Sequence, residues 1–188
     1  MMDARIPLLS LEDARRAARE AEVPEALAEL NIFRLLLHHP GFATQVSGML
    51  MTLLLRGKLD ARLRELVIMR IGWATGSVYE WTQHWRVATQ LGVDEVELLA
   101  LRDWRAYPDW SELDRAVLSA TDETLEAGAV SAETWALCGS LLPGVEEQLE
   151  LLGAIGTWRF VSQLLRSLEV PLEEGVAPWP PDGLPGGP

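Results

Sequence analysis

The feature that most constrains the fold is a pair of adjacent segments with helical periodicity, joined through a single glycine. The first segment follows Asp60, and its apolar residues are spread around most of the helical circumference, which is typical of a buried helix. It stops at Thr75-Gly76, and the second segment runs from Ser77 to the glycine at position 92. We therefore expect a helical hairpin whose first helix lies at the centre of the molecule.

Helical spacing and capping residues extend over most of the remaining sequence. We expect helices over 24–38, 41–55, about 111–126, about 131–140 and 145–168, with 102–110 as a loop. Asp94 and Glu97 have the spacing of a capping box for a further short helix. Because no segment alternates in the manner of a strand, the sequence predicts an all-α, multi-helix bundle.

The length of 188 residues suits one domain with a sizeable core. We expect residues 1–22 to form an N-terminal arm or short helix and residues 23–170 to form the helical domain. Residues 171–188 hold six of the eleven prolines, so this tail cannot be a regular helix and is a wrapping arm or disordered. Leu172 and Trp179 favour partial docking of the tail.

Charge and cysteine content exclude several classes of function. The net charge of −12, without any cluster of Lys or Arg, argues against nucleic acid as a partner. Cys138 is the single cysteine, so the chain has no disulfide framework, and the three histidines lack metal-ligand spacing. No apolar run approaches the roughly 20 residues that cross a bilayer. We expect a cytoplasmic protein that binds no metal and no membrane.

Three ionisable residues of the central hairpin form a candidate site. Glu80 and His84 are four residues apart, so they share one face of the second helix. Glu65 lies in the strongly apolar first helix, where a lone carboxylate carries a large desolvation cost unless it is paired or protonated. A short turn at Gly76 brings Glu65 toward His84, and a carboxylate that fixes a histidine tautomer can tune it for proton transfer.

A purely structural interpretation of these residues also fits the sequence. Ser77 and Glu80 have capping-box spacing, so both side chains could simply close the start of the second helix. His84 could be a core histidine with satisfied hydrogen bonds. Glu65 could pair with Arg62 or Arg64 at a helix surface.

The stretch from about 59 to 98, LDARLRELVIMRIGWATGSVYEWTQHWRVATQLGVDEVEL, resembles the core of the carboxymuconolactone decarboxylase and alkylhydroperoxidase-D-like superfamily. In the peroxidase branch, the resemblance implies that Glu65 and His84 match a proton-relay glutamate and histidine, while Ser77 and Glu80 stand in place of the two cysteines. Serine and glutamate cannot form a disulfide, so thiol peroxidase chemistry does not carry over. The decarboxylase branch is similar in having E-x-x-x-H, which Glu80 and His84 satisfy.

The catalytic candidates are therefore Glu65, Glu80 and His84. The candidates for substrate binding are Ser77, Trp73, Tyr79, Trp81, His39 and Arg34. Tryptophans bury large areas, so most are expected to be core or interface anchors, and a minority to line an apolar pocket. His38 and His39 could instead interact with the dipole at the end of the 24–38 helix, whereas the resemblance to longer family members suggests that His39 reaches the site.

The leading hypothesis is a cofactor-independent acid–base enzyme, a lyase (decarboxylase) or isomerase. Its substrate would be a small cyclic or carbonyl-containing carboxylic acid or lactone, and no organic cofactor is required. The alternatives are a non-catalytic helical binding or assembly module and, third, an atypical peroxidase. The resemblance and the many apolar surface positions imply a homo-oligomer, with a dimer, trimer or hexamer left open.

Overall fold

The computed structural model describes residues 4–186, which form an all-helical fold without a strand in that range, as predicted. Its helices are α1 Leu11–Glu20, α2 Asn31–Leu36, α3 Pro40–Met51, α4 Ala61–Thr75, α5 Val78–Gln90, α6 Glu95–Ala100, α7 Glu112–Ala127, α8 Ala132–Leu141 and α9 Val145–Ser167. Short 3-10 segments at Glu25–Glu29 and Leu101–Ala106 and a π-helical turn at Thr52–Arg56 connect them. Within the described range, no helix is long and apolar enough to cross a membrane.

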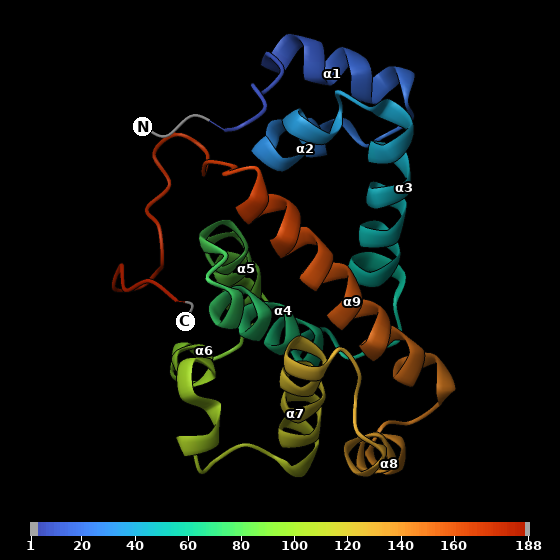
Figure 1. Cartoon of the computed structure of the whole chain (residues 1–188), viewed down its shortest axis with the longest axis vertical. Coiled ribbons are helices and arrows are strands. Elements are labelled where there is room, and N and C mark those ends of the chain that lie inside the picture. The colour runs from blue at the N-terminus through green and yellow to red at the C-terminus, as the bar shows by residue number, and fades with distance from the viewer. Residues whose placement is uncertain (1–3, 187–188) are drawn as a thin grey trace.

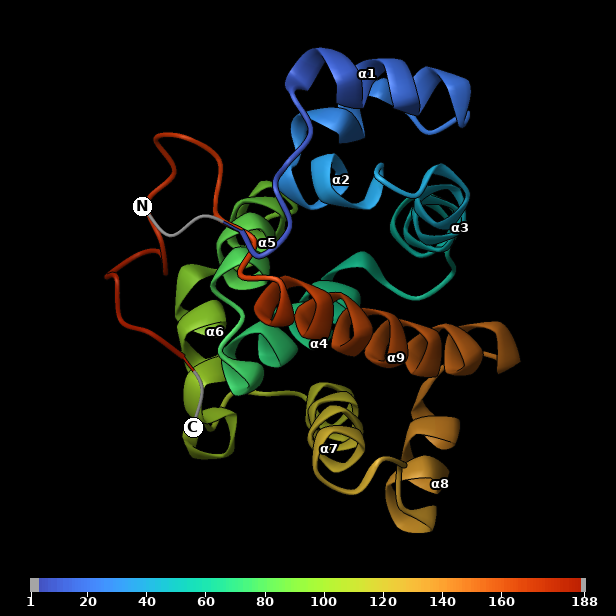
Figure 2. The ribbon, with the colours of Figure 1, turned by 45° about the horizontal axis from the view of Figure 1, so that its top comes forward.

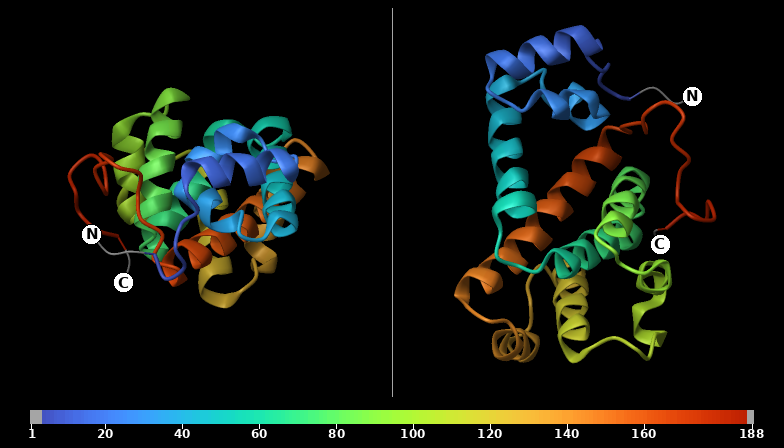
Figure 3. Two further views of the ribbon diagram at one scale, coloured as in Figure 1. Left: turned by 90° about the horizontal axis from the view of Figure 1, so that it is seen from above. Right: turned by 180° about the vertical axis from the view of Figure 1, so that it is seen from behind.

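Helix α4 lies at the centre, as the spread of its apolar residues predicted. It packs against α5, α7 and α9, and the four consecutive side chains from Leu66 to Met69 are completely buried. The long helix α9 crosses the molecule between the layer of α1, α2 and α3 and the helices α4 and α7 (Figures 2 and 3). Residues of α4, α5 and α9 therefore meet in the middle of the fold.

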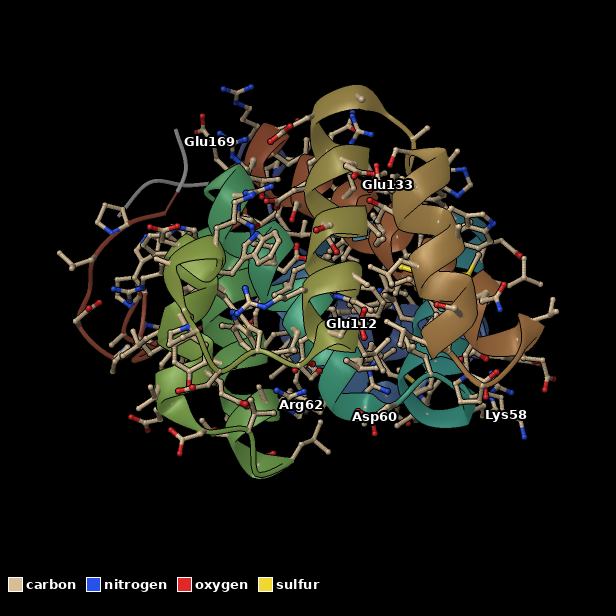
Figure 4. The ribbon with its side chains drawn as sticks, turned by 90° about the horizontal axis from the view of Figure 1, so that it is seen from below. Lys58, Asp60, Arg62, Glu112, Glu133 and Glu169 are labelled. Atoms are coloured by element: carbon tan, nitrogen blue, oxygen red, sulfur yellow. The ribbon has the colours of Figure 1, made fainter. Side chains whose placement is uncertain are left out.

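The N-terminal end of α4 is fixed by capping and by an ion-pair cluster. Asp60 caps the helix by accepting a hydrogen bond from the amide of Leu63, as the sequence indicated. Arg62 joins α4 to α6 through Glu97 at 2.8 Å and to α7 through Asp114 at 2.7 Å. Figure 4 shows Asp60 and Arg62 at this end of α4, on the underside of the molecule. The predicted capping box at Glu97 is wrong, because its carboxylate binds Arg62 while Asp94 caps α6 alone.

The helical hairpin depends on two glycines. Gly76 ends α4 with a φ of 68°, a left-handed conformation that favours glycine. Gly72 lies one turn earlier, where α5 approaches so closely that a Cβ atom would lie 3.0 Å from the backbone nitrogen of Trp81. The absence of a side chain at Gly72 thus sets the distance between α4 and α5.

Replacing Gly72 with Ala should destabilise the protein by about 1–3 kcal/mol, because backbone atoms of α5 cannot move aside easily. The change would otherwise favour the helix by about 1 kcal/mol. Gly48→Ala in α3 is the matched control, since nothing lies within 4 Å of a Cβ there, and it should stabilise the protein. Urea unfolding of both variants measures the difference. Equal stabilisation by both substitutions would show that α4 and α5 are not in tight contact.

The predicted helix over 24–38 is wrong in its extent. Leu30 has an extended ψ of 132°, which separates the 3-10 turn from α2. His39 does not lie at the end of that helix but begins α3, where its Nδ1 accepts a hydrogen bond from the Phe42 amide at 3.2 Å. His38 contacts the backbone oxygen of Pro7 at 2.7 Å. His39 therefore caps α3, and His38 holds the N-terminal segment against the end of α2.

The predicted loop over 102–110 is wrong in its first part, because a 3-10 segment covers Leu101–Ala106.

The tail from Pro171 lies against α5 (Figure 1). The carboxylate of Glu173 accepts hydrogen bonds from the hydroxyl of Tyr79 and from the amide of Gln83. Further along, the indole nitrogen of Trp81 donates to the backbone oxygen of Pro180 at 2.8 Å. Trp179 packs edge-on against Trp73. The tail is thus held at two places along its own length, Glu173 and Pro180, by residues 79–83 of α5.

Candidate functional site

A hydrogen-bonded chain of three side chains joins α4, α5 and α9. Oε2 of Glu65 on α4 lies 2.7 Å from Nδ1 of His84 on α5. The other ring nitrogen, Nε2, accepts a hydrogen bond from the indole nitrogen of Trp158 on α9 at 3.1 Å. The spacing of the sequence predicted that Glu65 and His84 come together, and the structure places them in contact.

This chain fixes the protonation of the imidazole. Since the indole N–H can only donate, Nε2 of His84 must accept, and the ring proton resides on Nδ1, where it is donated to Glu65. Glu65 is fully buried, and its second oxygen accepts two hydrogen bonds of 3.2 Å from the guanidinium of Arg64. The negative charge of Glu65 is therefore balanced by Arg64 inside the protein, not at a helix surface.

Glu80 is a buried carboxyl group without a cationic partner among the described residues. It is 2% exposed, and burial raises its pKa well above the ordinary value, although the hydrogen bond from Ser162 acts in the opposite direction. The hydroxyl of Ser162 on α9 contacts Oε2, while Oε1 has no hydrogen-bond partner. Burial therefore favours the neutral acid form of Glu80, and one of its oxygens is uncommitted.

Ser77 does not close the start of α5 with its side chain. It occupies the N-cap position, but its hydroxyl makes no capping hydrogen bond and has no partner in the described structure, although the residue is only 1% exposed. Glu80 does not reach back to the N-cap amide either, since its hydrogen bond goes to Ser162. The capping-box interpretation of this pair is wrong.

A cleft of about 710 Å³ lies beside this junction, between α4, α7 and α9. We call it the arginine cleft. Its charged lining residues are Arg70, Arg102, Arg159, Arg166, Asp122 and Glu126. Trp73 also lines it, as does Ser162, the residue whose buried hydroxyl contacts Glu80.

A second cleft of about 1080 Å³, the tail cleft, lies on the other side of the α4–α5 turn. Its walls are mostly apolar and come from α2, the end of α9 and the tail. Ser77, Tyr79, Asn31 and Arg34 contribute polar atoms. Arg166 lines both clefts, so the two lie on either side of the same turn of α9.

The structure separates the predicted site residues into groups. Trp73 lines the arginine cleft, whereas Ser77, Tyr79 and Arg34 line the tail cleft. Neither cleft is lined by Glu65, Glu80, His84, Trp81 or His39. Trp81 is fully buried, and Arg34 is engaged with the backbone oxygen of Leu9 at 2.9 Å. The catalytic candidates thus lie behind the cleft walls.

Sequence reasoning missed Trp158 and Ser162. Both lie on α9, and their separation of four residues puts them on the same face of that helix. A tryptophan and a serine at this spacing in an amphipathic pattern indicate a buried face. Nothing in the local sequence says that this face meets His84 and Glu80.

Cys138 gives no support for a peroxidase. It lies on α8 and is fully buried, and desolvation, with a smaller contribution from the charge of Glu123, raises the pKa of its thiol. A raised pKa keeps the thiol protonated and unreactive.

Comparison with known proteins agrees with this architecture. The sequence profile of the carboxymuconolactone decarboxylase family matches residues 40–123, which include α3, α4, α5 and most of α7. A comparison with curated proteins found no significant match.

Solved structures share the fold at low sequence identity. A peroxidase-related protein from Ralstonia eutropha JMP134 with an alkylhydroperoxidase AhpD core superposes with a TM-score of 0.74 at 14% identity, covering 93% of this chain and 94% of that chain. A putative antioxidant defence protein AhpD from Agrobacterium tumefaciens gives 0.66 at 19% identity, over 72% and 92%. The debrominase Bmp8 in complex with 2,3,4-tribromopyrrole gives 0.67 at 17% identity, over 87% and 86%.

The fold is all-helical and of the alkylhydroperoxidase-D-like type. Residues 40–123 match the carboxymuconolactone decarboxylase family, and the chain shares its fold with solved structures of the alkylhydroperoxidase-D-like type.

Proposed function

We propose that this protein is a cofactor-independent acid–base enzyme, a lyase (decarboxylase) or isomerase that acts on a small cyclic or carbonyl-containing carboxylic acid or lactone. The observation that carries the proposal is the buried Glu80, whose pKa is raised by burial and whose Oε2 contacts the hydroxyl of Ser162, a lining residue of the arginine cleft. A neutral carboxylic acid at pH 7 is a proton donor, and pKa values shifted in this way are common at functional sites.

Ser162 connects the acid to the cleft. In the structure, the hydroxyl of Ser162 donates to Oε2 of Glu80. For proton transfer, this hydroxyl turns toward a bound substrate and accepts from protonated Glu80, so that it gives its own proton to the substrate as it receives that of Glu80. In a decarboxylation, the electrons of the broken C–C bond form an enolate-like carbanion, CO₂ leaves, and this proton is added to carbon. Glu80 then recovers a proton from water.

The charges of the arginine cleft suit an anionic substrate. Arg159 and Arg166 are exposed, lie seven residues apart on α9 and have no carboxylate partner in the described structure. In a chain with a net charge of −12, such a cleft is a local attraction for carboxylates. A guanidinium group also matches the two oxygens of a carboxylate.

We assign Glu65 and His84 to positioning. The nitrogen of His84 that would exchange a proton with a substrate is occupied by the indole of Trp158. With this hydrogen bond in place, the pair holds α4, α5 and α9 in register and thereby keeps Glu80 against Ser162. Proton transfer by His84 itself would require Trp158 to move away.

The test is turnover of a panel of β-keto acids and unsaturated lactones, followed by CO₂ release and ultraviolet absorbance. Glu80→Gln should lower kcat by about 10²–10⁴-fold, since it removes the proton but keeps the shape. Glu133→Gln is the matched control, because it changes an exposed carboxyl group that lines neither cleft and should leave kcat nearly unchanged. Undiminished turnover by Glu80→Gln would overturn the proposal.

The pH dependence of stability tests two points: whether the Glu80→Gln variant is folded, and whether Glu80 is protonated in the folded wild type. Because the pKa of Glu80 is higher in the folded state, its contribution to stability is full below the unfolded value of 4.5 and is lost as the pH rises toward the folded pKa. Gln cannot ionise, so the variant should gain stability over the wild type as the pH rises, by up to about 1.4 kcal/mol per pH unit.

A second candidate is a helical binding module without catalytic activity. It is favoured by one observation: both ring nitrogens of His84 are hydrogen-bonded within the protein, and His84 lines neither cleft. This function predicts carboxylate binding in the arginine cleft without turnover of any compound of the panel.

A further inference from the structure

The end of the tail binds a wall residue of the arginine cleft. The carboxylate of Asp182 accepts two hydrogen bonds from the guanidinium of Arg102, from Nη1 at 2.7 Å and from Nη2 at 2.8 Å. Arg102 itself lines the cleft. A carboxylate of the chain therefore occupies both terminal nitrogens of an arginine that lines the cleft.

Arg102 is held rigidly for this contact. Its guanidinium lies over the rings of Trp73 and Trp81, with 4.6 Å and 5.5 Å to the ring centroids. Its side chain is 16% exposed, and its Nε is buried without a hydrogen-bond partner.

Asp182 is held much less firmly than Arg102. Its side chain is 39% exposed, and the following Leu184 is 57% exposed. Before it, Trp179 remains anchored by a hydrogen bond from its amide to Thr82 at 3.1 Å. Beyond it, Gly186 packs on Trp73. Residues 182–186 can therefore leave Arg102 while the anchor at Trp179 stays in place.

Asp182 is negatively charged near neutral pH, where a ligand carboxylate would have to replace it at Arg102. The hydrogen bonds from Arg102, together with one from the amide of Leu184, lower the pKa of Asp182 to about 2. A ligand carboxylate that replaces it keeps Arg102 paired, so the exchange leaves no buried cation without a partner.

We propose that Arg102 is the carboxylate-binding residue of the arginine cleft and that Asp182 competes with the ligand for it. The ligand is a small carboxylate, preferably on a flat ring that can lie against Trp73, and its binding releases residues 182–186. This inference rests on the proposed function only for the location of the substrate, because it concerns binding and not turnover.

A small carboxylate can then bind only to those molecules in which Asp182 has left Arg102, so its apparent affinity for the cleft falls in proportion to that fraction. A tethered carboxylate acts at an effective concentration in the millimolar range, while partly exposed ion pairs are weak. Removing this competitor should therefore tighten binding of a small carboxylate by about three- to tenfold.

The test is titration of the full chain with benzoate, followed by calorimetry and tryptophan fluorescence. Asp182→Asn should bind benzoate about three- to tenfold more tightly than the wild type. Asp109→Asn removes the same charge from an exposed position and should change the affinity less than twofold. Arg102→Gln should abolish binding. In the wild type, benzoate should accelerate amide hydrogen exchange at Leu184, whose amide donates to Asp182.

The outcomes separate this inference from the proposed function. Equal or weaker binding by Asp182→Asn, or benzoate binding that survives Arg102→Gln, would overturn the competition at Arg102 and leave the role of Glu80 intact. Absence of benzoate binding in all variants would overturn the carboxylate site as a whole. Tighter binding by Asp182→Asn with no turnover of any acid would support the site and contradict the enzyme.

Discussion

Replacing Glu65 with Gln should lower the free energy of unfolding by about 3–5 kcal/mol, because it leaves a buried cation without its counter-charge. Arg64 has a side chain only 9% exposed and pairs with Glu65, which has no exposed surface at all. The amide of Gln would also present one N–H group to partners that are both donors. Gln keeps one oxygen, so only one of Arg64 and His84 would still have an acceptor.

Chemical unfolding followed by circular dichroism measures this effect. The matched control is Glu29→Gln, which breaks the exposed pair with Arg15 and should cost less than about 1 kcal/mol. Similar losses in the two variants would mean that the Arg64–Glu65–His84 cluster is solvated in solution, and would remove the basis for assigning Glu65 and His84 to positioning.

Replacing Asp122 with Asn should cost about 3–5 kcal/mol near pH 7. Asp122 on α7 is 2% exposed and accepts hydrogen bonds from Arg70, Arg105 and the indole of Trp104. The Arg70 side chain is 14% exposed, so the neutral variant leaves a second poorly solvated cation. Since Arg70 and Asp122 both line the arginine cleft, the change also removes a negative charge from the cleft wall and should strengthen carboxylate binding there.

The pH dependence of this loss identifies its cause. Burial alone would raise the pKa of Asp122, but the hydrogen bonds from Arg70 and Trp104 outweigh it and lower the pKa below the ordinary value of 3.8. A group with a lowered folded pKa contributes stability above its unfolded pKa and loses it as the pH falls through the folded value. The difference between the wild type and Asp122→Asn should therefore shrink below about pH 4. A difference independent of pH would point to lost packing instead.

The central hairpin could be predicted from the sequence because its signals are local. The caps at Asp60, Ser111 and Ser131 and the glycine at 76 each begin or end a helix where the structure has it. The Glu65–His84 contact could be predicted for the same reason, since two helices joined by a short turn pack against each other.

Errors arose where a local signal competed with tertiary contacts. Ser77 and Glu80 carry the sequence of a capping box, yet neither side chain forms it, because α9 brings Ser162 against Glu80. Glu97 was expected to cap α6 but binds Arg62, which gives a carboxylate a stronger partner than a backbone amide.

By itself, the sequence determined the helical class of the fold, the position of α4 at its centre and the pairing of Glu65 with His84. These follow from periodicity, from glycine at a left-handed turn and from spacing within one hairpin. Only the tertiary structure decided that Trp158 occupies the second nitrogen of His84, that Ser162 links Glu80 to a cleft and that Asp182 meets Arg102. Those contacts join residues 74 to 82 positions apart in the chain, and they depend on which faces of α9 and the tail are buried together. Such long-range contacts depend on how the whole core packs, and no single segment of the sequence contains that information.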